Sequence, residues 1–554
     1  MAKVNLKEAP FYLAEEEIET VQRWKESLSP EQMIGQLFCL MGGDYSIEEL
    51  KDLVSNYGVG SILYRPAPTD EIKENYEALD QVVPVPLLKA ANLEEGGSGG
   101  TADGTLFGWP MTVGATGDES ICEDFAKCCA KEGRDAGINW TFSPVSDMSI
   151  NPLNPITNVR AFGDDLQLVL NMTKTYATTI QKYGVAACAK HFPGDGVDFR
   201  DQHLHPSYNH LSADEWYKTY GSIYRNLIDN GLLSIMTGHI VCPEVSMNKN
   251  PSLKYEDCMP GSLSKELLTG VLREEFGFNG VITTDATIMG GYTMNMPRKK
   301  AVVQSILAGA DMLVFSTDFQ EDYDAITEAV QSGAISKERL EEAVTRILAL
   351  KAVLCLRTYE IPQIQCEQAA QNCAQNAITL VKDTSEKYNE GTSYLPITVE
   401  KYPNIRLILL GEDALYDGSM REVAVSYFKQ KGFDVYEYHP IEDDLHGTSQ
   451  IPTDEITVYL ANEQTASNRT TVRLNWCEKH ALDIPRFINE QRSVFISLSN
   501  PYHLMDIPRI PIYINGYSAT KAILIAALDK LTGAEAFQGK SPVDAFCGLR
   551  DTRI

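Results

Sequence analysis

A repeated local pattern in the first 355 residues constrains the fold more than any other feature of the chain. A helical stretch is followed by glycine and then by a short apolar strand, as in YGVAACAK and NGLLSIMT. Gly137, Gly184, Gly231 and Gly280 are 47, 47 and 49 residues apart, which leaves room for a strand, a helix and loops in each interval. Glycine suits the left-handed position that ends a helix, and strands that are apolar almost throughout are typical of parallel strands buried on both faces.

Six such units and a further strand without the preceding glycine, VPLLKAA, make seven, and seven favour a closed (β/α)8 barrel over an open sheet. Their strands lie in YGVGSILY, VPLLKAA, AGINWTFS, YGVAACAK, NGLLSIMT, NGVITTD and AGADMLVF. The pattern alone does not identify the eighth strand. The segment 335–354 predicts an amphipathic helix with Ser336 as its N-cap, and we expect this helix to complete the barrel domain.

The length of 554 residues is too great for one ordinary core, so two domains are expected. We predict an α/β protein in which an N-terminal (β/α)8 TIM-type barrel precedes a smaller α/β sandwich. The predicted bounds are 1–355 for the catalytic barrel, 356–375 for a linker and 376–554 for the C-terminal sandwich. Strands alternate with helices in the last part, as in IRLILLGED followed by REVAVSYFKQKGF.

Charge and composition exclude several classes of partner. A net charge of −28 argues against a nucleic-acid partner and against docking on anionic lipid. No apolar run reaches the roughly 18 residues that a membrane helix needs, and the N-terminus shows no secretory signal. The twelve cysteines are scattered and form no CxxC pair, which favours a reducing cytoplasm. The oligomeric state stays open.

Polar residues that follow the apolar runs are the candidates for chemistry, because catalytic groups of parallel barrels lie at the C-terminal ends of the strands. Arg160, in the loop NPITNVRAFGDD, is a further candidate. His239 is as consistent with a hydrogen-bonded residue in the wall of the site as with a sugar ligand. Asp147 is expected to be structural and to cap backbone N–H groups. The strand-end candidates are Asn92, Glu94, Glu95, Asp147, Lys190, His191, His239 and Asp285.

The glycine-rich stretch KHFPGDGVDFRDQH places a carboxylate two residues from an imidazole, at Asp201 and His203. A carboxylate beside an imidazole holds its tautomer and raises its pKa toward neutrality, which suits general acid–base catalysis. A solvated loop with chance histidines is the alternative. His203 and His205 with further ligands also leave open a zinc-dependent barrel hydrolase.

The same stretch closely resembles the signature of glycoside hydrolase family 3, in its NagZ-like β-N-acetylglucosaminidase branch. FNGVITTDATIMGG resembles the nucleophile segment of this family. SPVSDMSINPLNPITNVRAFGDD resembles its sugar-binding loop, and PLLKAANLEEGG resembles its early substrate-binding turn. The C-terminal AITLVKD, SNPYHL and GKSPVDAF resemble the second domain of its two-domain members.

The resemblance implies a role for each matching residue. Asp285 is implied as nucleophile, and Asp201 with His203 as acid/base pair. The sugar ligands that it implies are Arg160, Lys190 and His191. The early turn of the family usually carries an aspartate where this chain has Leu93, so Asn92, Glu94 or Glu95 is expected to replace it. The second histidine of the glycine-rich motif is Asp195 here.

The resemblance thus implies a retaining, exo-acting β-N-acetylglucosaminidase that needs no metal or cofactor. Its substrates are expected to be carbohydrates with terminal β-linked N-acetylglucosamine, in muropeptide or chitooligosaccharide fragments. A β-glucosidase is an alternative. So is a phosphate-dependent N-acetylglucosaminide phosphorylase, because an imidazole acid/base does not repel phosphate as a carboxylate does. A non-catalytic sugar-binding protein is the alternative of another class.

Overall fold

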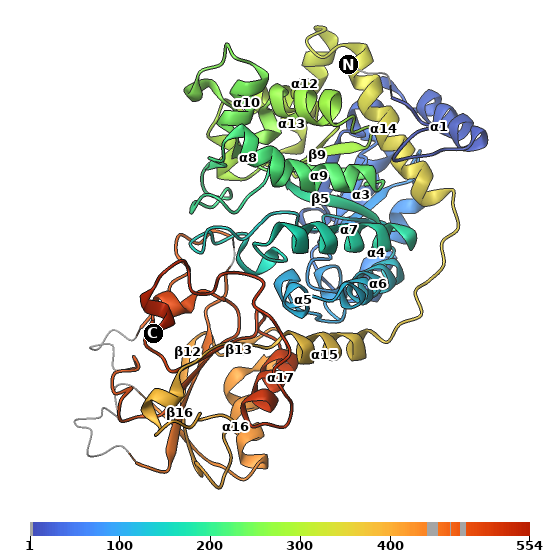
Figure 1. The fold of residues 1–554 in the computed structure, drawn as a ribbon. Coiled ribbons are helices and arrows are strands. Elements are labelled where there is room, and N and C mark those ends of the chain that lie inside the picture. The colour runs from blue at the N-terminus through green and yellow to red at the C-terminus, as the bar shows by residue number, and fades with distance from the viewer. Residues whose placement is uncertain (1–3, 440–451, 466, 477–482) are drawn as a thin grey trace. The chain divides into compact units, whose positions relative to one another are not determined.

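The protein is described by a computed structural model, which covers residues 4–439, 452–465, 467–476 and 483–554. Contacts divide it into two compact units (Figure 1). The first unit consists of Met1–Thr105, Cys122–Asn151 and Val169–Gln365. The second consists of Leu106–Ile121, Pro152–Leu168 and Cys366–Ile554. The predicted division was contiguous, whereas two segments of the N-terminal region group here with the C-terminal residues.

The first unit is built on a closed barrel of eight parallel strands in the order β1-β10-β9-β7-β5-β4-β3-β2. The barrel that the sequence predicted is therefore confirmed. The eighth strand, β1, is the apolar run FCLM between α2 and the next loop. The strands are β1 (Phe38–Met41), β2 (Ser61–Leu63), β3 (Leu88–Ala91), β4 (Trp140–Thr141), β5 (Ala186–Phe192), β7 (Ser234–Thr237), β9 (Val281–Ala286) and β10 (Met312–Val314).

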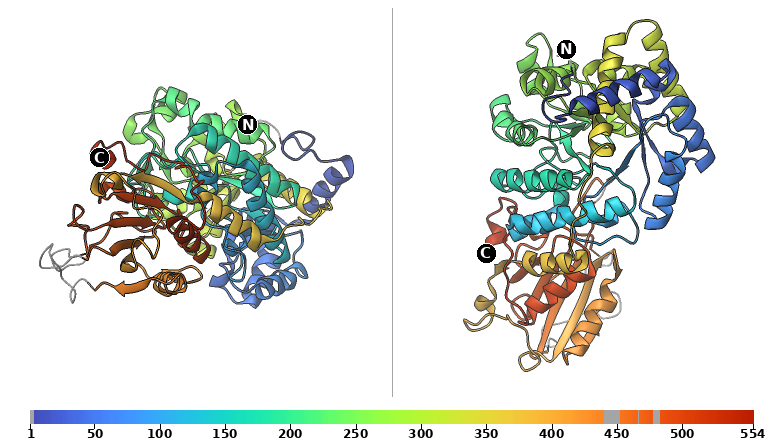
Figure 2. Two further views of the ribbon diagram at one scale, coloured as in Figure 1. Left: turned by 60° about the horizontal axis from the view of Figure 1, so that its bottom comes forward. Right: turned by 90° about the vertical axis from the view of Figure 1, so that its right-hand side faces the viewer.

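Helices surround these strands (Figures 1 and 2). The helix expected over 335–354 is α14 (Lys337–Cys355), and the Ser336 side chain accepts the N–H of Arg339 as its N-cap. The π-helix η7 (Glu266–Glu275) precedes β9. The short helix α2 (Pro30–Gly35) precedes β1, and the other long helices of the barrel region are α1 (Glu15–Ser27), α4 (Thr69–Asp80), α6 (Glu119–Asp135), α7 (Leu166–Lys182), α9 (Tyr220–Asp229), α12 (Arg298–Ala308) and α13 (Phe319–Gln331).

Three of the four periodic glycines adopt the expected left-handed conformation, and the fourth does not. Gly137, Gly184 and Gly231 have φ values of +83°, +83° and +80°. Before β9 the left-handed residue is instead Gly277, with φ of +67°. Gly280 is needed for close approach, because a Cβ there would lie 2.5 Å from the Leu233 carbonyl oxygen. The same residue type thus serves two different purposes at equivalent places in the pattern.

A buried ionic cluster joins three barrel elements. Asp311, just before β10, contacts Arg273 of η7 at 2.6 Å and two arginines of α14, Arg339 at 3.0 Å and Arg346 at 3.2 Å. Burial acts to raise the pKa of Asp311, but the three guanidinium groups outweigh burial and lower it. Asp311 also accepts the N–H of Ile282, so the cluster sets the start of β9, the strand that carries Asp285.

The second unit contains a six-stranded sheet in the order β11-β18-β17-β16-β12-β15, in which β11 alone is antiparallel. Helices α15, α16 and α17 accompany this sheet (Figure 1). Their side chains share one apolar core with alternate residues of the sheet. Among the described residues, no helix is long and apolar enough to cross a membrane. The elements are β11 (Thr379–Asp383), β12 (Asn404–Gly411), β15 (Asp434–Glu437), β16 (Glu455–Asn462), β17 (Ser493–Ser497), β18 (Ile512–Asn515), α15 (Cys366–Ala377), α16 (Met420–Gln430) and α17 (Lys521–Leu531).

The two segments from the N-terminal region are attached to this second unit by specific contacts. The N–H of Trp109 donates to the Ser518 hydroxyl at 2.7 Å. The N–H of Asp164 donates to the Pro542 carbonyl at 3.0 Å. Helix α15 begins at Cys366, inside the range 356–375 that we expected to be a linker. The extended part of that range is therefore shorter than predicted.

Candidate active site

Three neighbouring barrel strands carry polar residues at their C-terminal ends. Lys190 and His191 lie in β5, His239 follows β7, and Asp285 lies in β9. Since β5, β7 and β9 pair side by side and in parallel, these residues lie at one mouth of the barrel. The Asp285 side chain is 14% exposed, whereas that of His191 is only 4% exposed. Asp285 is therefore the more accessible group of this pair.

The carboxylate of Asp285 is surrounded by imidazoles. One of its oxygens accepts the N–H of Ala286 at 2.7 Å, and the other lies 3.8 Å from Nε2 of His191. Burial acts to raise the pKa of Asp285, but the imidazoles of His191, His239 and His203 outweigh it and lower the pKa. A carboxylate kept ionised in a partly enclosed site is suited to act as a nucleophile.

His191 is oriented by a second carboxylate. Oδ2 of Asp147 lies 2.7 Å from Nδ1 of His191, while Oδ1 accepts the backbone N–H groups of His191 and Asp195. A carboxylate only accepts, so Nδ1 carries the proton and Nε2 faces Asp285. Asp147 caps backbone N–H groups as expected, and it also orients an imidazole, which the sequence did not indicate.

Lys190 connects β5 to the turn after β3. Its ammonium group forms an ion pair with Glu94 and donates to Oδ1 of Asn92 at 3.1 Å. Leu93 is fully buried, while Asn92 is exposed at the end of the strand. Asn92 and Glu94, on either side of Leu93, thus both contact Lys190, and their replacement of the family's aspartate stays a prediction.

Asp201 and His203 form the hydrogen-bonded pair that their spacing suggested. Oδ1 of Asp201 lies 2.7 Å from Nδ1 of His203 and also accepts the backbone N–H of His203 at 2.7 Å. The Asp201 side chain is fully buried, whereas the His203 ring is 25% exposed. Because the carboxylate accepts a hydrogen bond from Nδ1–H, that proton stays on Nδ1, and Nε2 is the nitrogen available for proton exchange.

Two backbone hydrogen bonds join the chain at His203 to the segment that follows Asp285. The N–H of Gly290 donates to the His203 carbonyl at 2.8 Å, and the N–H of Gly291 donates to the Gln202 carbonyl at 3.1 Å. A Cβ on Gly290 would lie 2.2 Å from the Leu204 carbonyl oxygen, and one on Gly291 would lie 2.4 Å from that of Gln202. Only glycine permits this approach, which links the acid/base candidate to the nucleophile candidate.

Gln202 anchors the same loop to the barrel. Its amide donates to Asp195 at 3.2 Å and its oxygen accepts the N–H of His239 at 2.7 Å. Asp195, which replaces the family's histidine, is therefore part of the loop support. The ring nitrogens of His239 lie 2.9 Å from the Ser262 hydroxyl and 3.0 Å from the Ala286 carbonyl. This is the arrangement of a wall residue, and a sugar contact by His239 stays a prediction.

Replacing Gly291 with alanine is expected to lower kcat/KM by roughly 10–100-fold, because the new methyl group forces the His203 loop outward. The same overlap is expected to lower the thermal midpoint as well, so rates are compared at a temperature at which circular dichroism shows the variant to be folded. Gly43→Ala is the matched control, since a Cβ there meets nothing within 4 Å. Wild-type rates for Gly291→Ala would show that the loop position is not set by this contact.

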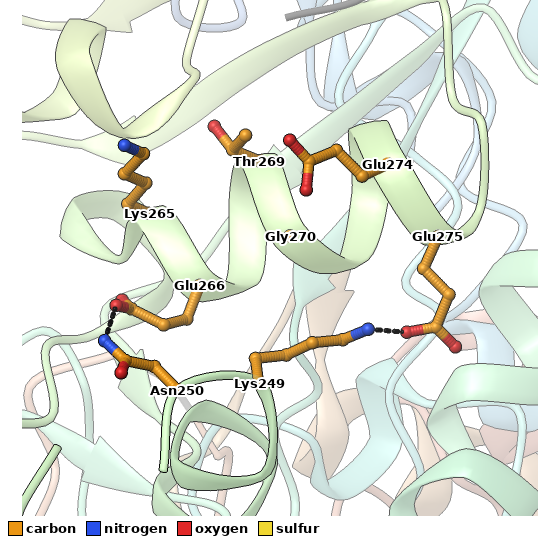
Figure 3. Close-up of a pocket in the computed structure, with 8 residues that line it drawn as sticks. All are labelled: Lys249, Asn250, Lys265, Glu266, Thr269, Gly270, Glu274 and Glu275. Carbon is orange, nitrogen blue, oxygen red and sulfur yellow. Dashed lines mark hydrogen bonds and ion pairs between the residues drawn. The ribbon is translucent and has the colours of Figure 1, made fainter. Parts of the chain in front are cut away.

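The structure does not test the remaining candidates. Arg160 ends the 3-10 helix η4 (Asn158–Arg160), which belongs to the second unit, so its part in the site stays a prediction. His205 is exposed, and no group of three or more metal-ligating side chains is found in the described part of the chain. A cavity of about 670 Å³ lies between α10 (Pro243–Lys249) and η7, where Lys249 pairs with Glu275 and Asn250 with Glu266 (Figure 3). It contains none of the predicted site residues.

Comparisons with known proteins identify the family. Residues 30–350 match the model of the glycosyl hydrolase family 3 N-terminal domain. The chain is 38% identical, over 100% of both sequences, to a β-N-acetylglucosaminidase/β-glucosidase of Cellulomonas fimi. A solved structure named β-glucoside phosphorylase BglX is 40% identical, with a TM-score of 0.90 over 99% of both chains. A family 3 β-N-acetylglucosaminidase from Paenibacillus shares the fold, with a TM-score of 0.76 and 24% identity over 94% of this chain and 100% of that one. This chain therefore belongs to glycoside hydrolase family 3 and is an enzyme that acts on β-linked sugars.

Proposed function

We propose that the protein is a retaining, exo-acting β-glycosidase that releases terminal N-acetylglucosamine by double displacement. The observation that carries the proposal is a pair of backbone hydrogen bonds. The N–H groups of Gly290 and Gly291, in the segment that follows Asp285, donate to the loop that carries the Asp201–His203 pair. A retaining enzyme needs a nucleophile on one side of the anomeric carbon and a proton donor on the other. We assign the first role to Asp285 and the second to His203.

In the first step, the Asp285 carboxylate attacks the anomeric carbon and forms a glycosyl ester. The bond to the leaving oxygen breaks, and Nε2 of protonated His203 gives that oxygen its proton. In the second step, neutral Nε2 takes a proton from water as the water oxygen attacks the anomeric carbon, and Asp285 is released as a carboxylate. Asp201 stabilises the imidazolium before the first step and after the second.

We assign the binding of the sugar hydroxyl groups to the polar side chains beside Asp285 and at the end of β3. Lys190, Glu94 and Asn92 form one connected set, and His191 lies beside Asp285. We assign Arg160 to the same task by its place in the family's sugar-binding loop. Such hydrogen bonds hold the ring in the geometry for attack. The proposed substrates are muropeptide or chitooligosaccharide fragments, and the proposed place of action is the cytoplasm.

The sugar preference is tested with nitrophenyl β-glycosides of N-acetylglucosamine and glucose. We expect a higher kcat/KM for the N-acetylglucosaminide, and the dual name of the full-length relative supports measurable activity on both sugars. A clear preference for the glucoside would make the protein a β-glucosidase. Binding of N-acetylglucosamine without turnover of any glycoside would instead indicate a non-catalytic sugar-binding protein. Full activity after chelator treatment is expected, because no step uses a metal.

Phosphorolysis is a second candidate, favoured by the identity of the proton donor. An imidazole adds no negative charge, so phosphate is not repelled from the glycosyl ester as it is by a carboxylate. The 40% identical structure named as a β-glucoside phosphorylase supports this alternative. The test is product analysis with and without inorganic phosphate. A glycosyl phosphate that forms at the expense of free sugar would identify a phosphorylase, and free sugar alone would identify a hydrolase.

A further inference from the structure

The loop that carries Asp201 and His203 is closed at its base by one carboxylate, that of Asp198. Oδ2 of Asp198 accepts the backbone N–H of Tyr208 at 2.8 Å, across ten positions of the chain. Oδ1 accepts the backbone N–H of Arg200 at 3.2 Å and its Nε at 3.1 Å, and Nη2 of Arg200 lies 2.8 Å from Oδ2. The Asp198 side chain is only 2% exposed. A nearly buried carboxylate therefore ties the two ends of this loop together.

The far end of the loop is fixed to neighbouring backbone. Tyr208 ends β6 (Ser207–Tyr208), which pairs in parallel with β8 (Ile240–Val241), the short strand that follows β7. The guanidinium group of Arg200 also lies over the Tyr208 ring, 4.9 Å from its centroid. Asp198 is therefore bound to a part of the loop that is itself held in place.

The near end of the loop is fixed by a residue from another strand connection. Asn151, in the loop after β4, donates its backbone N–H to the Gly196 carbonyl at 2.9 Å. Its side-chain amide donates to the Val197 carbonyl at 3.0 Å. These two carbonyls lie directly before Asp198 in the chain. The Asp198 carboxylate thus joins two anchored segments, and only residues 199–207 lie between them.

The contacts of Asp198 are those of a carboxylate that holds a loop. Both of its oxygens contact Arg200, and one also accepts from Tyr208. The turn that Oδ1 forms with the N–H of Arg200 ends directly before Asp201. Asp201 in turn orients His203 through Nδ1, at 2.7 Å. Through these successive contacts, Asp198 determines where Nε2 of His203 lies.

We propose that Asp198 is a positioning residue for the proton donor of the reaction. It acts without touching the substrate, by holding the loop where Nε2 of His203 reaches the leaving oxygen. The inference rests on the proposed function of Asp285 and His203 and adds a residue to it. A displacement of about 1 Å is enough to slow a positioned reaction roughly 100-fold. Asp285 is carried by β9 and not by this loop, so its attack is affected much less.

The test is the variant Asp198→Asn, which keeps the shape of the side chain. Its NH2 group faces donors, since the N–H of Tyr208 and the guanidinium of Arg200 only donate. We expect kcat/KM for alkyl β-glycosides to fall about 10–100-fold, because their leaving oxygen needs the proton. A dinitrophenyl leaving group needs none, so kcat/KM for that glycoside is expected to change less than about threefold. Its kcat and KM are expected to fall together, since His203 must still deprotonate the water that releases the sugar.

Arg200→Ala is a second variant, which is expected to fold because the Arg200 side chain is 38% exposed. It removes the guanidinium contacts but leaves the N–H of Tyr208 bound to Asp198. We expect the same selectivity for the leaving group, with a loss of about 3–10-fold on alkyl glycosides.

The matched control is Asp506→Asn. Asp506 is likewise nearly buried, forms an ion pair with Arg473 and accepts the backbone N–H of Leu474 at 3.0 Å, but it belongs to the second unit. Its ratio of alkyl to dinitrophenyl kcat/KM is expected to equal that of the wild type, even where the thermal midpoint falls.

Two results would overturn the inference: equal slowing of both substrates by Asp198→Asn, or wild-type rates on both. Failure of the proposed function gives a different result. In that case the wild type does not cleave the dinitrophenyl glycoside, or His203→Ala shows no dependence on the leaving group.

Discussion

Replacing Asp285 with asparagine is expected to lower kcat/KM by about four orders of magnitude or more, with the fold intact. The amide has nearly the shape of the carboxylate, so the contacts to Ala286 and His191 lose charge but little packing. An amide oxygen is a far weaker nucleophile, and the two carboxylates that are paired with imidazoles nearby are not free to replace Asp285. Asp147 and Asp201 are fully buried and each is bound to an imidazole.

Initial rates on nitrophenyl glycosides measure this loss, and circular dichroism with the thermal midpoint checks the fold. Asp70→Asn is a suitable control, because Asp70 is exposed in α4, in the first unit. A second readout is chemical. A 2-fluoro-glycosyl fluoride traps a covalent ester on a retaining enzyme, and mass spectrometry is expected to find the adduct on the peptide with Asp285. Near-native activity of the variant, or an adduct on another residue, would refute the assignment.

The barrel was predictable because its strands are buried on both faces and each is preceded by a helix end. The strand that the pattern missed, β1, also follows a glycine, Gly35 at the end of α2, but it lies before the first of the seven units and outside their regular spacing. Two domains were expected from the length, but the discontinuous make-up of the second unit was not predictable. Segments 106–121 and 152–168 group with Cys366–Ile554, and no local pattern reports such distant contacts.

The residues of the site could likewise be predicted only where local sequence determines their position. Position at a strand end identified Lys190, His191, His239 and Asp285, because that position follows from the topology alone. The partner of His191 was seen only as a cap, since the pairing of Asp147 with an imidazole depends on the packing of β4 beside β5. The role of the Gly290–Gly291 pair was likewise hidden, because it depends on the backbone of a loop almost ninety residues earlier.

Replacing His203 with alanine is expected to slow the enzyme according to the leaving group. Alkyl glycosides need a proton on the departing oxygen, so their kcat/KM is expected to fall by about 10²–10⁴-fold. Dinitrophenyl glycosides leave as stable anions, so their kcat/KM is expected to change less than about tenfold. Steady-state rates across a series of aglycones measure this as a steeper dependence on the acidity of the leaving group.

His205→Ala is the matched control, because His205 is on the same loop, two residues away and exposed. It is expected to leave the leaving-group dependence unchanged. Asp201→Asn is a second test variant. The amide of asparagine can donate a hydrogen bond to His203 as well as accept one, so it no longer fixes the proton on Nδ1. That variant is expected to lose activity on alkyl glycosides in the same direction as His203→Ala but to a smaller extent. If His203→Ala slows all aglycones equally, His203 only positions the substrate, and another group must supply the proton.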